Sequence, residues 1–151
     1  MTTERNCWTV LAQRAQDAAS AIQTELGQIR ARLDSLNASK ARLAKLYEDY
    51  RLQENQANHS LQGMREVMNQ RQFMTQLLTL MQRVANDVAQ AEKNLAETRS
   101  RLMAAERERL KMQTLADQNA QAILTLAEQR EQRQMDALGV MQFNLRSPPS
   151  R

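Results

Sequence analysis

The side chains that most often perform chemistry in proteins are few in this sequence, and their spacing does not bring them together. His59 is the only histidine, and neither a cysteine nor a second histidine lies near it, whereas a zinc site needs three or four protein ligands. Cys7 is the only cysteine and has no neighbouring histidine to activate its thiol. Glu48 and Asp49 are adjacent, so on a helix they point to different faces. We therefore expect no metal, no cofactor and no enzymatic activity.

The composition favours helices and a reducing compartment. Gly27, Gly63 and Gly139 lie too far apart to form a phosphate-binding loop. Both prolines, Pro148 and Pro149, lie in the last four residues, so no earlier proline stops a helix. A single cysteine excludes an internal disulfide. No segment resembles a signal peptide or approaches the ~20 apolar residues of a membrane span, so we expect a cytoplasmic protein without direct membrane insertion.

The charge is basic overall but mixed along the chain. Lysine and arginine number 21 against 17 aspartates and glutamates, for a formal net charge of +4. Arginines alternate with acidic residues, and no uninterrupted basic block reaches five residues. No aromatic residues punctuate the arginines as base-stacking platforms would. This distribution is typical of exposed helix faces with local charge pairing, and we expect no binding to nucleic acid.

A seven-residue repeat organises the chain. Its first apolar series is Trp8, Ala15, Ile22, Ile29, Leu36, Leu43 and Tyr50. A second flank starts with Leu11 and Ala18 and then shifts by one place to Leu26, Leu33 and Tyr47, with Lys40 interrupting it. Two further series occupy the second half of the chain: Met81, Val88, Leu95, Leu102, Arg109, Ala116 and Ile123, and Leu77, Val84, Ala91, Thr98, Ala105, Met112, Asn119 and Leu126. Alternating steps of three and four keep one stripe of a helix against a partner helix.

These patterns predict an all-α fold, a long antiparallel two-helix coiled-coil hairpin. Helix one runs from about residue 3 to 51, the hairpin region covers about 52–72, and helix two runs from about 70 to 138. Gly139 is the expected helix stop. One domain over 1–147 and a flexible tail over 148–151 complete the expected organisation, with the stretch from about Asn119 to Leu138 overhanging the N-terminus. The hairpin favours a free monomer; a parallel homodimer or a self-associated helix bundle is the alternative.

Aromatic and methionine residues suggest a contact surface. Folding back near residue 61 gathers Leu43, Tyr47, Tyr50, Phe73 and Leu77 at the hairpin end. These residues either close the base of the hairpin or form an anchor patch for a partner, because aromatics contribute strongly to interfaces. Met81 and Met112 lie on the seam and are interpreted as core. Other methionines suit either an adaptable binding surface or gap filling; they are Met64, Met68, Met74 and Met103.

Three runs of the chain together resemble the FliJ family, the small coiled-coil proteins of the flagellar type III export apparatus. The runs are LAKLYEDYR (43–51), RQFMTQLLTL (71–80) and EQREQRQMDAL (128–138). The resemblance covers nearly the whole chain. It implies an antiparallel coiled coil similar to the γ stalk of rotary ATPases, placed at the cytoplasmic face of the inner membrane through the export apparatus.

The resemblance also implies partners and contact residues. The end with the free termini enters the hexameric export ATPase FliI and stimulates it, the hairpin end contacts the export gate protein FlhA, and export chaperones are recycled. Carried over by position, the gate contacts are Leu43, Leu46, Tyr47, Tyr50, Phe73, Leu77, Leu80 and Val84. The family often has tyrosine in place of Leu46 and a polar residue in place of Val84. The ATPase contacts correspond to Trp8, Leu11, Arg14, Arg130, Arg133, Met135 and Asp136.

Two other functions fit the same residues. One is the equivalent stalk of a virulence injectisome, which the sequence does not separate from the flagellar protein. The other is a self-associating structural coiled coil, or a cytoplasmic chaperone, without an ATPase partner. Mass in solution discriminates between a monomeric hairpin and an obligate dimer.

Overall fold

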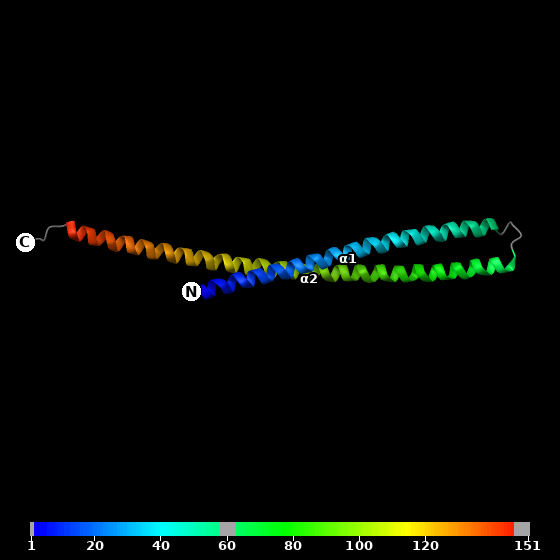
Figure 1. The fold of residues 1–151 in the computed structure, drawn as a ribbon, viewed down its shortest axis with the longest axis horizontal. Helices are drawn as coiled ribbons and strands as arrows, with labels where there is room; N and C mark the ends of the chain where they lie inside the picture. The colour runs from blue at the N-terminus through cyan, green and yellow to red at the C-terminus, as the bar shows by residue number, and fades with distance from the viewer. Residues whose placement is uncertain (1, 58–62, 147–151) are drawn as a thin grey trace, which may run out of the picture. The chain divides into compact units, whose positions relative to one another are not determined.

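The chain forms two long helices in a computed structural model that describes residues 2–57 and 63–146, with side chains over 7–56 and 63–146. Helix α1 spans Thr2–Ala57 and helix α2 spans Met64–Arg146 (Figure 1). Gly63 is the only described residue outside a helix. The predicted all-α fold, a long antiparallel two-helix coiled-coil hairpin, is confirmed.

The chain divides into two compact units, and each helix contributes to both. The hairpin unit is Ser20–Met103, and the terminal unit combines Met1–Ala19 with Ala104–Arg151. The single domain expected over 1–147 stays a prediction. The tail expected over 148–151 and His59 lie outside the described residues.

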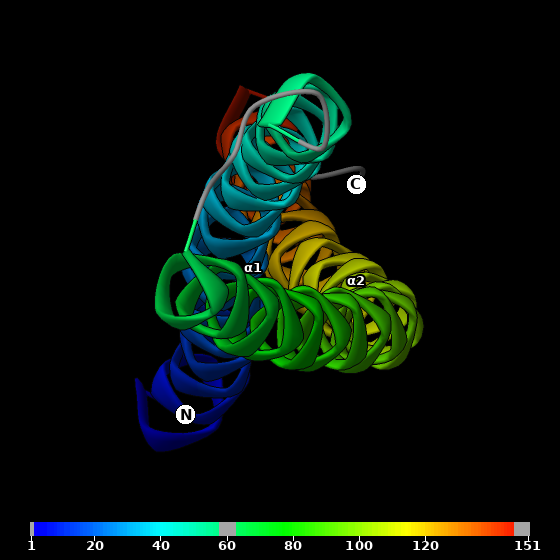
Figure 2. The same cartoon turned by 90° about the vertical axis from the view of Figure 1, so that its right-hand side faces the viewer.

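In the hairpin unit the two helices run antiparallel. Near the connection, the Tyr50 ring of α1 packs against the Phe73 ring of α2 in a tilted arrangement, and farther along the unit Glu25 of α1 pairs with Arg101 of α2. Residues that contact each other across the two helices are therefore farther apart in the sequence the farther they lie from the connection, as expected for antiparallel helices. Viewed from the side of the connection, the cyan part of α1 and the green part of α2 are inclined to each other (Figure 2). Such an inclination accompanies knobs-into-holes packing of long helices.

The least exposed side chains of the hairpin unit form the stripe that the seven-residue repeat predicts. Leu26, Leu77, Val88 and Ala91 are buried together with one polar residue, Thr98. Half-buried side chains continue the stripe at Ile22, Ile29, Leu33, Leu36, Leu43, Tyr47, Tyr50, Met81, Val84, Leu95 and Leu102. At the expected interruption, Lys40 is exposed and the neighbouring Ser39 is half-buried. The seam of the hairpin unit therefore consists mainly of large apolar side chains.

The seam of the terminal unit is built differently, and here the expected second flank is wrong. Ala12 and Ala19 are buried, with 9% and 2% of their surface exposed, whereas Leu11 is only half-buried and Ala18 is exposed. Counting by sevens from Ala12 leads through Ala19 to Leu26 without the predicted shift. Alanine contributes little apolar area to a helix face. A seam assigned by side-chain size therefore starts from Leu11 and misses the series that starts at Ala12.

The apolar seam of α2 ends earlier than its heptads suggest. Arg109, Met112, Ala116, Asn119 and Ile123 are half-buried, as their series predict. Leu126, the last residue of one series, is instead 53% exposed, and every residue from 124 to 146 is exposed. The uncovered stretch therefore begins at residue 124 rather than near Asn119. Heptad spacing identifies a face but not whether a partner covers it.

The helix limits differ from the predicted ones on both sides of the connection. Helix α1 continues to Ala57 rather than ending near Arg51, and α2 begins at Met64 rather than near residue 70. The first turn of α2 is closed by the amides of Glu66 and Val67, which donate to the Gly63 carbonyl oxygen at 3.1 and 3.4 Å. Loss of an apolar seam therefore does not end a helix, because residues such as glutamine and glutamate have high helix propensity.

Helix α2 also passes through its expected stop. Gly139 is helical, has no positive φ, and lies within a helix that continues to Arg146. A glycine inside a helix costs about 1 kcal/mol relative to alanine, which good helix formers on both sides can offset. A glycine ends a helix when its left-handed conformation forms the cap, and that conformation is absent here.

Candidate docking surfaces

The predicted gate-contact residues lie in the hairpin unit, and the packing divides them into two groups. Leu77 is buried, with 4% of its surface exposed, and Leu43, Tyr47, Tyr50 and Val84 are half-buried along the seam. The rings of Tyr50 and Phe73 lie 4.6 Å apart between centroids, at an interplanar angle of 39°. The predicted proximity of Tyr50 and Phe73 is therefore confirmed, and the choice between closing the base and anchoring a partner stays a prediction.

The remaining members of the set point outward. Leu46 and Phe73 each expose 38% of their surface, and Leu80 exposes 46%. With about 100° of rotation per residue, Phe73 and Leu80 lie on the same side of the Leu77 stripe. These side chains can therefore reach a partner, whereas Leu77 acts through packing.

A second apolar surface was not anticipated from the sequence. A groove of about 320 Å³ lies between the two helices of the hairpin unit, lined by Lys40, Leu43, Ala44, Leu78, Met81, Gln82 and Ala85. Leu78, on its wall, is 48% exposed, yet only Leu43 belongs to the predicted contact set. The sequence could have indicated this surface, because Leu78 follows the seam residue Leu77 directly and therefore lies beside the seam rather than on it.

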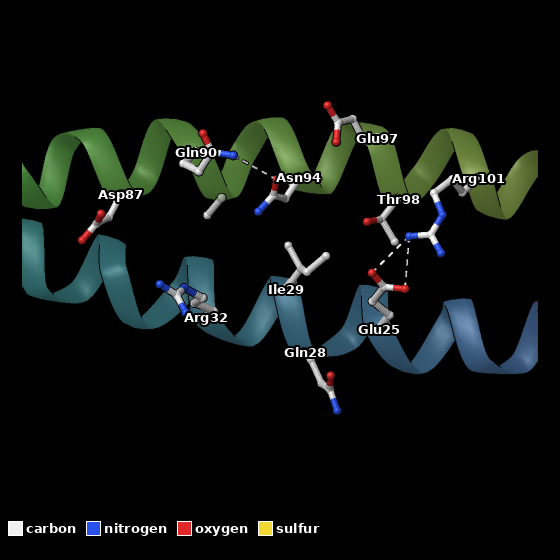
Figure 3. Close-up of a pocket in the computed structure, with 11 residues that line it drawn as sticks. Glu25, Gln28, Ile29, Arg32, Asp87, Gln90, Asn94, Glu97, Thr98 and Arg101 are labelled. Carbon is white, nitrogen blue, oxygen red and sulfur yellow. Dashed lines mark hydrogen bonds and ion pairs between the residues drawn. The ribbon is translucent and has the colours of Figure 1, made fainter.

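Another hollow of the hairpin unit is polar. It measures about 560 Å³ and is lined mainly by charged and amide side chains, with Ile29, Ala91 and the buried Thr98 beneath them. Figure 3 shows Glu25 and Arg101 facing each other across the helices; Arg101 Nη1 donates to both carboxylate oxygens at 3.1 and 3.2 Å. Small residues at 91 and 98 leave this hollow. Among the described residues no group of acidic, histidine or cysteine side chains can hold a metal ion.

The predicted ATPase contacts all belong to the terminal unit. Trp8 is half-buried and lines a shallow hollow of about 250 Å³ with Ala12, Ala116, Asn119 and Ala120, among others. Leu11 is half-buried, whereas Arg14 is exposed. Nearby on α2, the seam position Arg109 is tolerated because its Nε donates to Glu106 Oε2 at 2.9 Å.

The other predicted ATPase contacts lie on the uncovered stretch of α2. Arg130, Arg133 and Asp136 are exposed, and Met135 exposes 67% of its surface. Gln132 Nε2 donates to Asp136 Oδ1 at 3.2 Å. The same stretch exposes large apolar residues, namely Leu124, Leu126, Leu138, Val140, Met141, Phe143 and Leu145. No helix of the described chain is long and apolar enough to cross a membrane.

Two long paired helices that expose large apolar side chains define a coiled-coil protein with surfaces suited to docking. A family model described as "Flagellar FliJ protein" matches residues 9–147, and the chain belongs to the FliJ family. No curated protein and no solved structure matches the chain. Membership gives the protein an export-related role in the flagellum, within a family of structural export components.

Proposed function

We propose that this protein is a stalk that inserts into the hexameric export ATPase FliI, stimulates it, and couples it to the export gate protein FlhA. The observation that carries the proposal is the division of the two candidate contact sets between two units of different construction. The gate set lies in the hairpin unit, and the ATPase set lies in the terminal unit, where α2 exposes every residue from 124 to 146. Recycling of export chaperones is part of the same proposal.

The ATPase contact follows from the uncovered helix of the terminal unit. A helix without a partner presents exposed apolar side chains that a protein pore can bury. Arg130 and Arg133 are exposed on it and suit acidic pore loops, because rim charges guide association. Met135, exposed on the same stretch, offers a flexible, polarizable contact.

The gate contact follows from the outward side chains of the hairpin unit. Leu46, Phe73 and Leu80 are exposed, and the contact with the half-buried Tyr50 ring holds the Phe73 ring in place. Aromatic and aliphatic anchors of this kind supply most of the binding energy of an interface.

The first experiment titrates the purified chain into its cognate export ATPase and follows hydrolysis together with ring assembly. Saturable stimulation with rings appearing is the expected result. Replacing Arg130 and Arg133 by glutamate should reduce the stimulation about tenfold, because two favourable contacts become repulsive. The matched control replaces the exposed Arg30 and Arg99 of the hairpin unit by glutamate and changes net charge equally. Equal losses in both variants, or no stimulation by the natural chain, contradict the stalk role.

The gate contact has its own test. Leu80→Ala should weaken binding to the cytoplasmic part of FlhA by more than about 1 kcal/mol, as expected for an interface anchor. Leu78→Ala is the control, because Leu78 is similarly exposed on the same helix but belongs to the other side. Unchanged affinity in Leu80→Ala, with helicity retained, removes this residue from the gate contact.

A further inference from the structure

The groove beside Leu78 has the shape of a helix-binding site. Leu43 and Met81 are half-buried and form its floor, while Leu78 stands on its wall. Ala44 and Ala85 also line it, and their short side chains keep the groove open where longer ones would close it. An apolar groove between two helices that lie side by side can accept the apolar stripe of a third helix.

This groove lies on the opposite side of the hairpin unit from the gate-contact surface. Leu78 and Leu80 are two residues apart, so their side chains are separated by about 200° around α2. Their exposed fractions are nearly equal, 48% and 46%. The groove shares Leu43 with the predicted gate set and none of the outward residues Leu46, Phe73 or Leu80.

The helix segments that carry the groove hold a local excess of positive charge. Residues 35–47 and 71–86 contain no aspartate or glutamate, and their basic residues are Lys40, Arg42, Lys45, Arg71 and Arg83. These five positive charges exceed the formal net charge of +4 of the whole chain. Lys40 lines the groove itself, and no described residue forms a salt bridge with Lys40, Arg42 or Lys45.

We propose that the groove formed by Leu43, Ala44, Leu78, Met81 and Ala85 binds an amphipathic helix with acidic flanks from a protein partner. The apolar stripe of that helix would cover Leu78, and its acidic residues would lie near Lys40 and the surrounding basic side chains. Apolar burial supplies affinity in such a complex, and charge complementarity supplies specificity.

Nucleic acid fits this surface less well. Its phosphates match the basic residues, but the groove is lined mainly by apolar, non-aromatic side chains and offers no aromatic platform for bases. A protein helix satisfies both the apolar groove and the charge. The inference does not depend on the proposed stalk function, and it gives the hairpin unit a second partner on the side facing away from the gate contact.

The test uses the full chain and a defined probe. The probe is a fluorescein-labelled synthetic helix of three heptads with leucine at the a and d positions and glutamate on the flanks. Its twin carries lysine in place of every glutamate. Fluorescence anisotropy in about 0.1 M salt should show saturable binding of the acidic helix and at least about tenfold weaker binding of the basic twin.

Two variants locate the site on the chain. Leu78→Glu should weaken binding of the acidic helix at least about tenfold, because it places a carboxylate where apolar contact is needed. Leu80→Glu is the matched control and should change it by less than about twofold, since the side chain lies on the other side of α2. Ala44→Glu introduces bulk and negative charge directly into the groove and should weaken binding as Leu78→Glu does.

Several results would overturn the proposal. Equal affinity for the acidic and basic helices indicates unspecific apolar association, and equal effects of Leu78→Glu and Leu80→Glu place the binding elsewhere. Displacement of the acidic helix by an unrelated DNA duplex at the same ionic strength indicates a general polyanion site. Circular dichroism of each variant verifies that helicity is kept, so weaker binding reports the groove and not unfolding.

Discussion

The hairpin unit and the terminal unit use the same heptad spacing but fill it with different side chains. In the hairpin unit the buried seam residues include Leu26, Leu77 and Val88. In the terminal unit they are Ala12 and Ala19, and the half-buried seam residues of α2 include the polar Arg109 and Asn119. Because the hydrophobic contribution grows with the apolar area removed from water, the hairpin unit should supply most of the stability.

The difference teaches that a continuous coiled-coil pattern can have unequal strength along its length. Segments with few buried apolar contacts open most readily. A polar residue at a seam position fixes register at a cost in stability, and the pair between Arg109 and Glu106 shows how one such position is accommodated. We therefore expect the terminal unit to separate its helices more easily than the hairpin unit.

The largest effect is expected from truncating the hairpin seam. Leu77→Ala should lower the free energy of unfolding by about 2–4 kcal/mol, because it leaves a cavity at a buried position. Urea denaturation followed by circular dichroism measures the change. The neighbouring Leu78→Ala, at a 48% exposed position, should cost far less. A loss below about 1 kcal/mol in Leu77→Ala would show that the seam of this unit is not its main support.

Hydrogen exchange compares the two units directly. Backbone amides near Met112 and Ala116 should exchange at least about tenfold faster than those near Val88 and Leu95, equivalent to about 1.4 kcal/mol of opening free energy. Amides of 124–146 should exchange fastest, because no helix covers them. Mass spectrometry of peptic fragments after timed labelling measures these rates. Uniform protection of both units would remove the proposed difference in strength.

A pair of glycine substitutions sharpens the comparison. A Cβ added to Gly27 or to Gly139 meets no atom within 4 Å, and neither glycine has a positive φ. Gly27→Ala should therefore raise the free energy of unfolding by about 1 kcal/mol, through higher helix propensity. Gly139→Ala should raise helicity but leave the urea midpoint unchanged, since its helix stretch has no partner. A shift of the midpoint in both variants would indicate that residues 124–146 unfold together with the hairpin.

The smallest effect is expected from the charge pair that joins the helices of the hairpin unit. The side chains of Arg101 and Glu25 are 56% and 43% exposed, and exposed pairs contribute less than about 1 kcal/mol. A double-mutant cycle with Glu25→Gln and Arg101→Gln should give a small coupling energy that decreases further in high salt. A coupling above about 2 kcal/mol would mean that this pair, and not the apolar seam, fixes the helix register.

The sequence predicts the fold well because heptad spacing is a strong periodic signal. The series through Ile29 and Leu36 and the series through Val88 and Leu95 fall entirely on buried or half-buried positions. The series that starts at Leu77 does so until its last residue, the exposed Leu126. The predicted flank through Leu11 and Ala18 is wrong because the buried residues are Ala12 and Ala19, and alanine is too small to stand out in an apolar pattern. The predicted helix end at Gly139 is wrong because glycine ends a helix only where it adopts a cap conformation, and the neighbouring residues determine whether it does.

The candidate sites are less accessible to sequence reasoning. Folding the chain back near residue 61 predicts that Tyr50 lies beside Phe73, and the two rings are in contact in the structure. Which side chains point outward depends on rotation about each helix. The sequence alone therefore does not distinguish Leu78 from Leu80, although the two leucines lie on opposite sides of α2. The groove depends on two alanines, Ala44 and Ala85, from different helices, and their proximity requires the register of the pair.

The seam of the hairpin unit restricts how its length can change over generations. An insertion of one residue in α1 turns everything that follows by about 100°, so the remaining seam residues would leave the interface. Loss or gain of a whole heptad in one helix preserves the stripe but shifts every opposing pair, including Glu25 with Arg101. Viable length variants should therefore add or remove seven residues in both helices at matching positions.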